Sequence, residues 1–576
     1  MQRARVAQRT GEWRSGSRRV CVERSLGPCY HRPPMTPPAR YYVTTSIAYA
    51  NNRPGLHTLY EVIGADAVAR WYRMNGVPTR FLTGTDEHSL NIPVRAAEQG
   101  KSPREFVDEI AQIFQRAESD LLIAPDRFIR TTDPDHARAA SEMIRRAYAS
   151  GDIYVGTYEG WYCPSEGFRS ESDLIHEGDM VRCPNHPTIT LEWVAEKNWF
   201  FRLSAYQERI ERLFADRPDF VEPDFRRNEM LAFIKRGLED FSISREHVSW
   251  GLPFPIREDG SNAVLPDGSP DPSAGRIYVW FDALTNYITG AGFPDDMESF
   301  ARWWPADVHI IGKDINRFHS IYWPAMLMSA GLEVPRKVWV HGFLTVQGER
   351  MSKSLGNLLD PDVMVSAFGA DGARYVTLRE VPFDRDSDVS WDTFVRRYNA
   401  DLANDFGNLL NRTLNMTGRF VDGERPAPAE AARSSLGTVW ANIWRSYGEK
   451  IEGYVLHEAL EALWEFVGDA NRFVDREQPW LLSKQALAGD AAAGERLRDT
   501  LGDLLEACRL IALTGAPFMP GMAERVHAQL GLEFGYGADG NGGPPIAEQA
   551  AWGATWSSGK IGTSEILFPR IEMAQS

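Results

Sequence analysis

The stretch Y-Y-V-T-T-S-I-A-Y-A-N-N-R-P-G-L-H-T, residues 41–58, decides the fold of this chain. It begins with a short β-rich run from Tyr41 to Thr45, and a helix is predicted over about 59–74, where apolar residues recur on one face. A strand, a tight turn and a helix N-terminus form a nucleotide-binding opening, because free backbone N–H groups and the helix dipole favour phosphate there. The sequence therefore predicts an α/β fold with a Rossmann-like parallel sheet.

Two further motifs make this unit specific. T-G-T-D-E-H at 83–88 follows a second predicted strand, and the loop G-E-R-M-S-K-S-L-G-N at 348–357 lies between a predicted strand over 338–343 and a helix start at Asp360. A loop that holds one compact cation, here Lys353, against a charged anion suits phosphoryl or nucleotidyl transfer. A lone S-K-S is more often an ordinary polar surface loop, so the motif gains its meaning from its neighbours.

Composition excludes several classes of protein. The chain has 576 residues with 43% hydrophobic and 25% charged residues, which is typical of a globular protein of several domains. No apolar run approaches the roughly 18 residues of a membrane span. A formal net charge of -16 argues against nucleic-acid binding by bulk attraction but allows a local basic path. Five cysteines suit a reducing compartment, so we expect a cytoplasmic protein without membrane contact, as a monomer rather than an oligomer.

Residues 1–34 differ from the rest, since arginines far outnumber acidic residues there and little apolar periodicity is present. Such composition is typical of an organellar transit peptide. A wrongly assigned start is the simpler explanation, because Met35 stands directly before the first structured run. In both cases residues 1–39 are predicted to be a disordered N-terminal extension.

Several stretches, taken in order, resemble the methionyl-tRNA synthetases, a family of class I aminoacyl-tRNA synthetases. The resemblance covers about 40–572, and Arg350 stands where the family's K-M-S-K-S loop usually has Lys, which keeps the charge but not the donor geometry. The stretches are Y-Y-V-T-T-S-I-A-Y at 41, F-L-T-G-T-D-E-H at 81, D-F-S-I-S-R at 240, Y-V-W-F-D-A-L-T-N-Y at 278, G-K-D-I-N-R-F-H at 312, R-M-S-K-S at 350, R-Y-N-A-D-L-A-N-D-F-G-N-L-L-N-R at 397, A-N-R-F-V-D at 470 and L-F-P-R-I-E at 567.

The resemblance implies a domain order. A Rossmann-like catalytic domain is interrupted by a connective insertion and followed by a region that carries the signature loop and contacts the tRNA stem. An α-helical bundle that binds the anticodon comes last. The predicted boundaries are 40–126 and 236–330 for the catalytic halves, 127–235 for the insertion, 331–392 for the signature-loop region and 393–576 for the bundle.

The implied activity is a methionine–tRNA ligase that takes methionine, ATP and tRNA(Met) as partners, with Mg²⁺ sharing the phosphate charge. Two alternatives stay open: a catalytically impaired tRNA-binding or regulatory relative, and a class I synthetase for another apolar amino acid. The second is disfavoured because no large editing insertion is visible. Methionine-dependent ATP/pyrophosphate exchange would discriminate among these.

One departure falls in the family's first signature, H-x-G-H or H-x-G-T, where this chain reads Gly55, Leu56, His57, Thr58. The family's first His is expected to contact ATP phosphate, and its Gly leaves room for the adenine ring, so His57 should crowd the base. Losing one transition-state donor costs about 3–4 kcal/mol. We therefore predict weak or absent adenylation unless His57 reaches the phosphates from its new position.

Site residues follow from the resemblance, position by position. An unbranched apolar substrate side chain needs close aromatic walls, although Trp280 or Phe318 alone would more simply be a core residue. Leu284 stands where the family often has Pro. The predicted catalytic residues are Lys353, His57 and Asp86, the last pairing with the substrate ammonium. The predicted ATP site is Gly55, His57, Thr58, Lys313, Asp314, Arg350, Met351, Ser352, Lys353 and Ser354. The predicted methionine site is Ile47, Tyr49, Asp86, Trp280, Ala283, Tyr287, Phe318 and His319.

A zinc knuckle is only partly present in the predicted insertion. Cys163, Cys183 and His186 offer three ligands, and Glu166 or water would be a poor fourth, whereas a structural zinc site wants four N or S ligands. C-P-S-E-G-F reads like the family's C-x-x-C-E-x-F with its second Cys missing. Bound Zn²⁺ and a lost site are equally compatible with the sequence.

The C-terminal part reads as helices over 434–450, 455–475, 492–514 and 518–530. The resemblance places anticodon reading on Asn408, Arg412 and Trp480. Aromatic stacking and hydrogen bonds from Asn and Arg are how single-stranded loop bases are read. Trp480 directly follows Pro479, so it could equally be a packing residue at a helix start.

Overall fold

The computed structural model describes residues 38–163, 167–169, 174–178, 180–184, 186–246, 248–346, 349–350 and 359–572. Residues 39–576 form one compact unit. The predicted N-terminal extension, apart from its last two residues, lies outside the described part, as do Glu166 and the loop residues 351–354. Within the described helices, none has the length and apolar character that crossing a membrane requires.

A parallel sheet of seven strands, counted over the described residues, confirms the predicted α/β class. Its order is β11-β16-β15-β1-β3-β2, and β4 also pairs with β3. Every pairing is parallel, with β1 in the interior of the sheet. The strands are β1 (Tyr41–Thr45), β2 (Ala48–Tyr49), β3 (Thr79–Asp86), β4 (Arg127–Arg130), β11 (Val221–Glu222), β15 (Val308–Gly312) and β16 (Val338–His341).

The register brings several strand ends to one edge. Thr45, the last residue of β1, lies beside Ile310 of β15, and Gly312 at the end of β15 lies beside His341 at the end of β16. Asp86 ends β3. In open parallel sheets the carboxyl edge is where ligands bind, so this edge is the place to look for a site.

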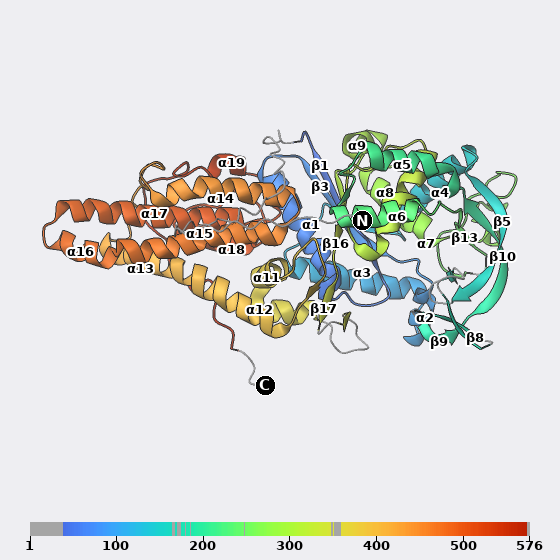
Figure 1. The fold of residues 1–576 in the computed structure, drawn as a ribbon, viewed down its shortest axis with the longest axis horizontal. Helices are drawn as coiled ribbons and strands as arrows, with labels where there is room; N and C mark the ends of the chain where they lie inside the picture. The colour runs from blue at the N-terminus through green and yellow to red at the C-terminus, as the bar shows by residue number, and fades with distance from the viewer. Residues whose placement is uncertain are drawn as a thin grey trace, which may run out of the picture. The chain divides into compact units, whose positions relative to one another are not determined.

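Helix α1 (Leu56–Met74) leaves this edge and packs against β1, β3 and β15, and also against α11 (Pro361–Glu380) and α14 (Ser435–Glu452), as Figure 1 shows. Almost all of its residues are buried, because a helix between two layers has no solvent face. It begins three residues before the predicted Leu59. Gly55 takes the extended N-cap position, with φ -108° and ψ 173°.

Buried charges on α1 are paired. Asp66 accepts a hydrogen bond from Nε of Arg70 at 2.7 Å and forms an ion pair with Arg374 of α11, also at 2.7 Å. Arg374 also donates to the carbonyl oxygens of Phe518 and Pro517. Since an isolated buried charge is very costly, these contacts tie α1 to the C-terminal helices.

Shorter helices surround the sheet and position the segments that reach its carboxyl edge. α3 begins with a capping box in which Ser102 and Glu105 satisfy each other's backbone N–H groups. These helices are α2 (Asn91–Glu98), α3 (Pro103–Asp120), α4 (Pro134–Ala149), α5 (Gln207–Asp216), α6 (Asp224–Ile234), α7 (Val279–Ala283), α8 (Asn286–Ala291), α9 (Met297–Trp303) and α10 (Trp323–Ser329).

Antiparallel strands fill much of the predicted insertion over 127–235. β4 and β11 also fall within this segment yet pair with the central sheet, so the sheet takes strands from both of its ends. The domain division itself stays a prediction. The antiparallel strands here are β5 (Ile153–Cys163), β6 (Gly167–Arg169), β7 (Ile175–Glu177), β8 (Met180–Cys183), β9 (His186–Thr190) and β10 (Glu192–Phe201). Just beyond the predicted insertion, β12 (Phe241–Ser242) pairs with β10. Small ladders elsewhere use β13 (Ser244–Arg245), β14 (Arg276–Ile277), β17 (Leu344–Val346), β18 (Glu349–Arg350) and β19 (Ser387–Asp388).

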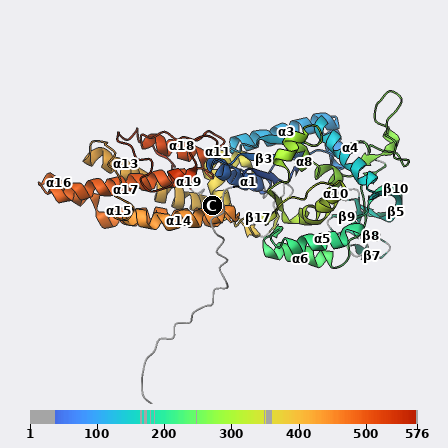
Figure 2. The same cartoon turned by 90° about the horizontal axis from the view of Figure 1, so that it is seen from above.

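The C-terminal part is a helical bundle, as the periodicity predicts. α14, α15 and α17 pack together and run alongside one another in both views (Figures 1 and 2). The four predicted helices correspond to α14, α15, α17 and α18, whereas α16 was not predicted as a separate helix. The remaining bounds are α12 (Trp391–Arg397), α13 (Asn408–Phe420), α15 (Leu456–Glu477), α16 (Pro479–Leu487), α17 (Ala491–Gly515), α18 (Pro520–Gln529) and α19 (Ile546–Gln549).

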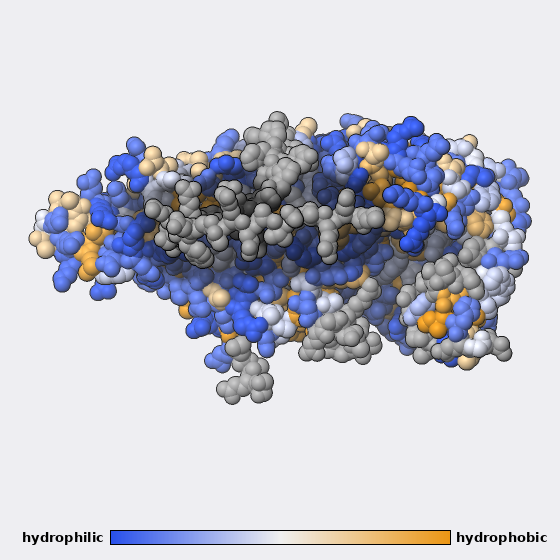
Figure 3. Space-filling model, viewed as in Figure 1, coloured by the Kyte–Doolittle hydropathy of each residue, from blue (hydrophilic) through white to orange (hydrophobic). Residues whose placement is uncertain are grey.

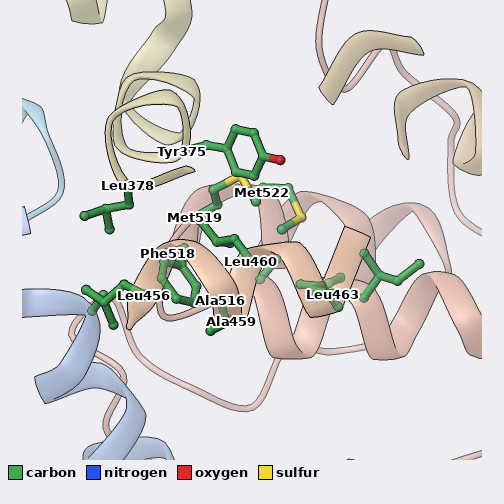
Figure 4. Close-up of a cluster of buried hydrophobic side chains, with 14 of the residues drawn as sticks. Tyr375, Leu378, Leu456, Ala459, Leu460, Leu463, Ala516, Phe518, Met519 and Met522 are labelled. Atoms are coloured by element: carbon green, nitrogen blue, oxygen red, sulfur yellow. The ribbon is translucent and has the colours of Figure 1, made fainter. Parts of the chain in front are cut away.

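One hydrophobic core runs from the sheet into this bundle, because the same cluster contains Val43 of β1 and Leu460 of α15. In Figure 4, Tyr375 and Leu378 of α11 lie close to α15, and Met522 lies beside Tyr375. Each of these side chains is fully buried. Helix α11 is therefore part of the bundle's core.

Candidate active site

A cavity of about 650 Å³ opens at the carboxyl edge of the parallel sheet. Asp86, Gly312 and His341, which end three strands, all line it, as does Ser46 directly after β1. The sequence-predicted residues found in its lining are Ile47, Tyr49, His57, Thr58, Asp86, Trp280, Ala283, Tyr287, Asp314 and His319. The structure thus gathers residues from five distant stretches around one space.

The first turn of α1 forms the nucleotide side of the cavity. His57 and Thr58 line the cavity, while Gly55 is buried just before the helix. The backbone N–H of Leu56 donates to the carbonyl oxygen of Leu359, and that of Thr58 donates to the carbonyl oxygen of Gly55. Because the N-terminus of α1 lies at the cavity, the positive end of the helix dipole faces that space. His57 is exposed at the cavity, and partial desolvation of its ring lowers its pKa.

An aromatic wall faces this turn. Trp280 of α7 stacks on Phe318 with ring centroids 3.7 Å apart and an interplanar angle of 11°. Trp280 lines the cavity, and Phe318 supports it from behind without lining the cavity itself. Ala283 and Leu284 continue the same wall. Flat aromatic and small aliphatic groups of this kind suit an unbranched apolar ligand.

Two hydrogen-bonded side chains form the base of the cavity. The hydroxyl of Tyr287 lies 2.6 Å from Nε2 of His319, and Nδ1 of His319 lies 3.0 Å from the carbonyl oxygen of Ile315. Burial lowers the pKa of His319 to about 4, so the ring is neutral. A carbonyl only accepts, so Nδ1 carries the hydrogen and the Tyr287 hydroxyl donates to Nε2.

Asp86 is a buried carboxylate in the lining of the cavity. Burial, and after it the negative charge of Asp282, raise the pKa of Asp86 to about 7. Asp282 is fixed between His88 and His136, each 2.6 Å away. Burial alone would raise the pKa of Asp282, but the two histidines outweigh it and hold that pKa at about 2. A poised carboxylate beside a permanently charged one is an arrangement that favours a cationic ligand.

Lys313 differs from the other predicted ATP residues. Its ammonium forms an ion pair with Asp386 and lies 4.5 Å from the ring centroid of Phe343. It is not among the described residues that line the cavity, whereas its neighbour Asp314 is. The side chains of Arg350, Met351, Ser352, Lys353 and Ser354 lie outside the described part of the chain, so their predicted roles stay predictions.

The lining residues that the sequence reasoning missed include Glu61, Asn286 and His341. Glu61 stands four residues after His57, which places both on one face of a helix. His341 is the last residue of a parallel strand, where ligands bind. Helical spacing could have pointed to Glu61, and the end of a predicted strand to His341, although neither signal predicts that the two side chains are in contact.

The predicted anticodon residues lie on neighbouring helices. Asn408 is exposed at the start of α13, and Arg412, one turn later, forms an ion pair with Asp475 at 3.2 Å. Trp480 is 42% exposed in the first turn of α16, which packs against α13. Figure 3 shows hydrophobic residues on the viewed face at the end of the bundle where Figure 1 labels α16. Trp480 is therefore not a purely internal packing residue.

The predicted zinc ligands are only partly described. Cys183 is buried in a small cluster with Val181 and Leu191, while for Cys163 and His186 the backbone alone is described. Among the described side chains, no group of three or more His, Cys, Asp or Glu residues could hold a metal ion. Zn²⁺ stays a prediction.

The parallel sheet, the helix dipole aimed at its edge and the partly apolar cavity together define a nucleotide-binding α/β protein. Comparisons narrow this class. The family model for class I tRNA synthetases (M) matches residues 41–188 and 181–414. The methionine–tRNA ligase of Thermotoga maritima is 41% identical over 536 residues, covering 92% of this chain and 80% of that protein. That of Mycobacterium bovis is 45% identical over 498 residues, covering 85% and 92%.

Solved structures agree. Mycobacterium tuberculosis methionyl-tRNA synthetase in complex with methionyl-adenylate matches with a TM-score of 0.83 and 41% identity, over 92% of this chain and 100% of that one. Its apo form matches with a TM-score of 0.77 and 38% identity, over 93% and 99%. The chain belongs to the class I methionyl-tRNA synthetase family.

Proposed function

We propose that this chain is a methionine–tRNA ligase. In the first step, a carboxylate oxygen of methionine attacks the α-phosphorus of ATP, which forms methionyl-adenylate and releases pyrophosphate. In the second, a ribose hydroxyl at the 3′ end of tRNA(Met) takes the acyl group and AMP leaves. The single cavity that joins the first turn of α1 to the aromatic wall and Asp86 carries this proposal, because it can hold both substrates side by side.

Methionine is proposed to bind with its ammonium on Asp86 and its thioether side chain against the aromatic wall. Ile47, Tyr49, Trp280 and Ala283 supply apolar contacts, with Phe318 behind Trp280. One methylene discriminates by only about 1–3 kcal/mol, so selectivity depends on this close fit. Tyr287 and His319 form a neutral, hydrogen-bonded base that adds no charge beneath the side chain.

ATP is proposed to bind across the α1 N-terminus, near Gly55, His57, Thr58 and Asp314. Lys353 would neutralise charge on the α-phosphate and the leaving pyrophosphate, as the resemblance implies. Isolated cavity carboxylates, without a metal-binding cluster among the described residues, do not form a preorganised Mg²⁺ site. Mg²⁺ would be carried chiefly by the nucleotide's own phosphates, and no step proposed here depends on a protein ligand to it.

The tRNA is proposed to reach the bundle with its anticodon on Asn408, Arg412 and Trp480. The exposed indole of Trp480 offers a stacking face, and the exposed amide of Asn408 offers hydrogen bonds. Replacing Trp480 by Ala should raise the KM for tRNA in aminoacylation and leave pyrophosphate exchange unchanged. Leu487→Ala, at an exposed position later in α16, is a matched control.

The test of the activity is ATP/pyrophosphate exchange with methionine, leucine and isoleucine in parallel. We expect exchange with methionine alone. Exchange with leucine or isoleucine at equal efficiency would contradict the proposed specificity, and no exchange with any amino acid, even at high enzyme concentration, would contradict the proposed activity.

A further inference from the structure

Glu61 joins three walls of the cavity through one buried carboxylate. Its Oε1 accepts hydrogen bonds from the backbone N–H and the hydroxyl group of Ser46, at 2.6 and 2.7 Å. Its Oε2 lies 2.7 Å from Nε2 of His341. The contacts connect α1, the loop after β1 and the end of β16. All three residues line the cavity.

The hydrogen bonds of His341 favour a charged ring. Nδ1 lies 2.7 Å from the carbonyl oxygen of Gly342, which can only accept, so Nδ1 carries a hydrogen. Nε2 faces the Glu61 carboxylate, whose other oxygen accepts two hydrogen bonds from Ser46. Burial opposes charge on His341, but the Glu61 carboxylate outweighs it and raises the pKa of His341 above its usual value.

The backbone at this point is fixed in place. A Cβ atom on Gly342 would lie 2.0 Å from the carbonyl carbon of Arg385, so only glycine allows the two segments to pass this closely. The ring of His341 is also held between Phe383, at 5.8 Å and 24°, and the edge of Tyr60, at 5.5 Å. The imidazole therefore has one position at the edge of the cavity.

The described lining of the cavity is otherwise poor in positive charge. Asp86, Asp314 and Asp360 are acidic, and the guanidinium of Arg53 is shared with Asp362 at 3.2 Å. Partial desolvation lowers the pKa of His57, which makes this ring a weaker source of positive charge than a free histidine. A polyphosphate entering this space needs a cation near the sheet edge, and Gly55 supplies none.

We propose that Glu61 is a positioning residue for adenylation, which holds the Ser46 loop in place and keeps His341 as an imidazolium at the nucleotide side of the cavity. This rests on the proposed function. The imidazolium offsets the Glu61 carboxylate and reduces the repulsion that an acidic lining would exert on the phosphates. Glu61 itself contacts no substrate. Its effect is exerted through the charge and the position of His341.

Several charged or titratable groups lie on the elements packed against His341. α1 contributes Glu61, His57 and Tyr60, and the turn after β15 contributes Lys313, which is paired with Asp386, and Asp314. The segment after α11 contributes Asp384, Arg385 and Asp386. Of these, Glu61 hydrogen-bonds the ring and Asp314 adds a weaker attraction for its proton.

The test is the pH profile of methionine-dependent pyrophosphate exchange between pH 5.5 and 9 for the unsubstituted chain, Glu61→Gln, Glu61→Asp and His341→Asn. We expect activity to fall at high pH as His341 loses its proton. In Glu61→Gln the fall should move to lower pH by about one unit, with kcat at neutral pH reduced about tenfold and the KM for methionine changed less than about twofold. Glu61→Asp should recover much of the loss, and His341→Asn should abolish the falling limb.

Glu98→Gln, an exposed carboxylate on α2, is the matched control and should leave the profile unchanged. Methionine binding to each variant shows whether the cavity has folded. A Glu61→Gln profile that superimposes on that of the unsubstituted chain would overturn the proposal. So would an equal loss of exchange activity at every pH, with the KM values for methionine and ATP both raised. Absence of exchange in the unsubstituted chain is a separate result, because it removes the proposed function itself.

Discussion

The hydroxyl group of Tyr287 donates a hydrogen bond to Nε2 of His319 across 2.6 Å at the base of the cavity. The donor and acceptor are fixed because Nδ1 of His319 already donates to Ile315. The ring of His309 also stacks on the ring of Tyr287, with the two centroids 4.1 Å apart. The base of the methionine pocket is therefore rigid and uncharged.

Replacing Tyr287 by Phe should raise the KM for methionine by about 5- to 20-fold, because the change leaves the buried Nε2 of His319 without a donor at a cost of about 1–2 kcal/mol. The KM for ATP should change little. Steady-state exchange kinetics at varied methionine measure this. Tyr536→Phe, which loses a hydrogen bond to Pro544 away from the cavity, should leave the KM for methionine unchanged. An equal effect in both variants would contradict a specific role.

Restoring the family's order with the double substitution Gly55→His and His57→Gly should raise kcat/KM for pyrophosphate exchange about 100-fold. His at 55 regains a phosphate donor, and Gly at 57 frees space for the adenine ring, which together reverse a loss of about 3 kcal/mol. Gly55 has φ -108° in an extended conformation that any residue adopts, so the backbone accepts the change. The single substitutions separate the two effects, and an unchanged double variant would refute the prediction.

Methionine affinity should depend on pH through Asp86. The substrate ammonium binds the ionised carboxylate, and the pKa of Asp86 in the free protein is about 7 because of burial and the charge of Asp282. Below that pH a proton must leave before methionine binds, so the Kd should rise by up to about tenfold per pH unit between roughly 7 and 5. Calorimetry in buffers of different ionisation enthalpy measures the proton released. A flat Kd over this range would exclude Asp86 as the ammonium partner.

Asp86→Asn should bind methionine weakly at every pH yet change stability in a pH-dependent way. The folded pKa is raised, so the folded state holds a proton that the unfolded state loses, and Asp86 contributes stability below about pH 4 that is lost as the pH rises through about 7. Asn does not titrate, so the Asp86→Asn variant does not lose stability in this way as the pH rises. The free energy of unfolding of the variant relative to the parent should therefore increase with pH, by up to about 1.4 kcal/mol per unit. A difference that is constant from pH 4.5 to 8 would contradict the raised pKa.

Sequence patterns could predict the parallel sheet and the bundle because β1 and α1 carry local signals, a β-rich run and helical spacing. Trp280 and His319 could be placed in one pocket only through the resemblance, since no spacing rule connects residues so far apart. The Glu61–His341 contact was out of reach, because it depends on the parallel register of β15 with β16 and on where α1 begins. For Lys313, the motif predicted a role in the ATP site, but the sequence could not show that its ammonium pairs with Asp386, 73 residues away.

Because the sheet and the bundle share one hydrophobic core, substitutions in the bundle should change the free energy of unfolding of both parts. Leu460 of α15 is fully buried beside α11, so Leu460→Ala should cost about 2–5 kcal/mol through lost transfer energy and the cavity left behind. Leu487, which is 88% exposed on α16, should cost less than about 0.5 kcal/mol when replaced by Ala. Denaturant unfolding followed by far-UV circular dichroism and by tryptophan fluorescence measures both.

Because one cluster contains residues of β1 and of α15, the two probes should report one shared transition, and in Leu460→Ala both should shift together. Separate midpoints, with only the helical signal shifted, would show that the bundle unfolds independently of the sheet despite the continuous core.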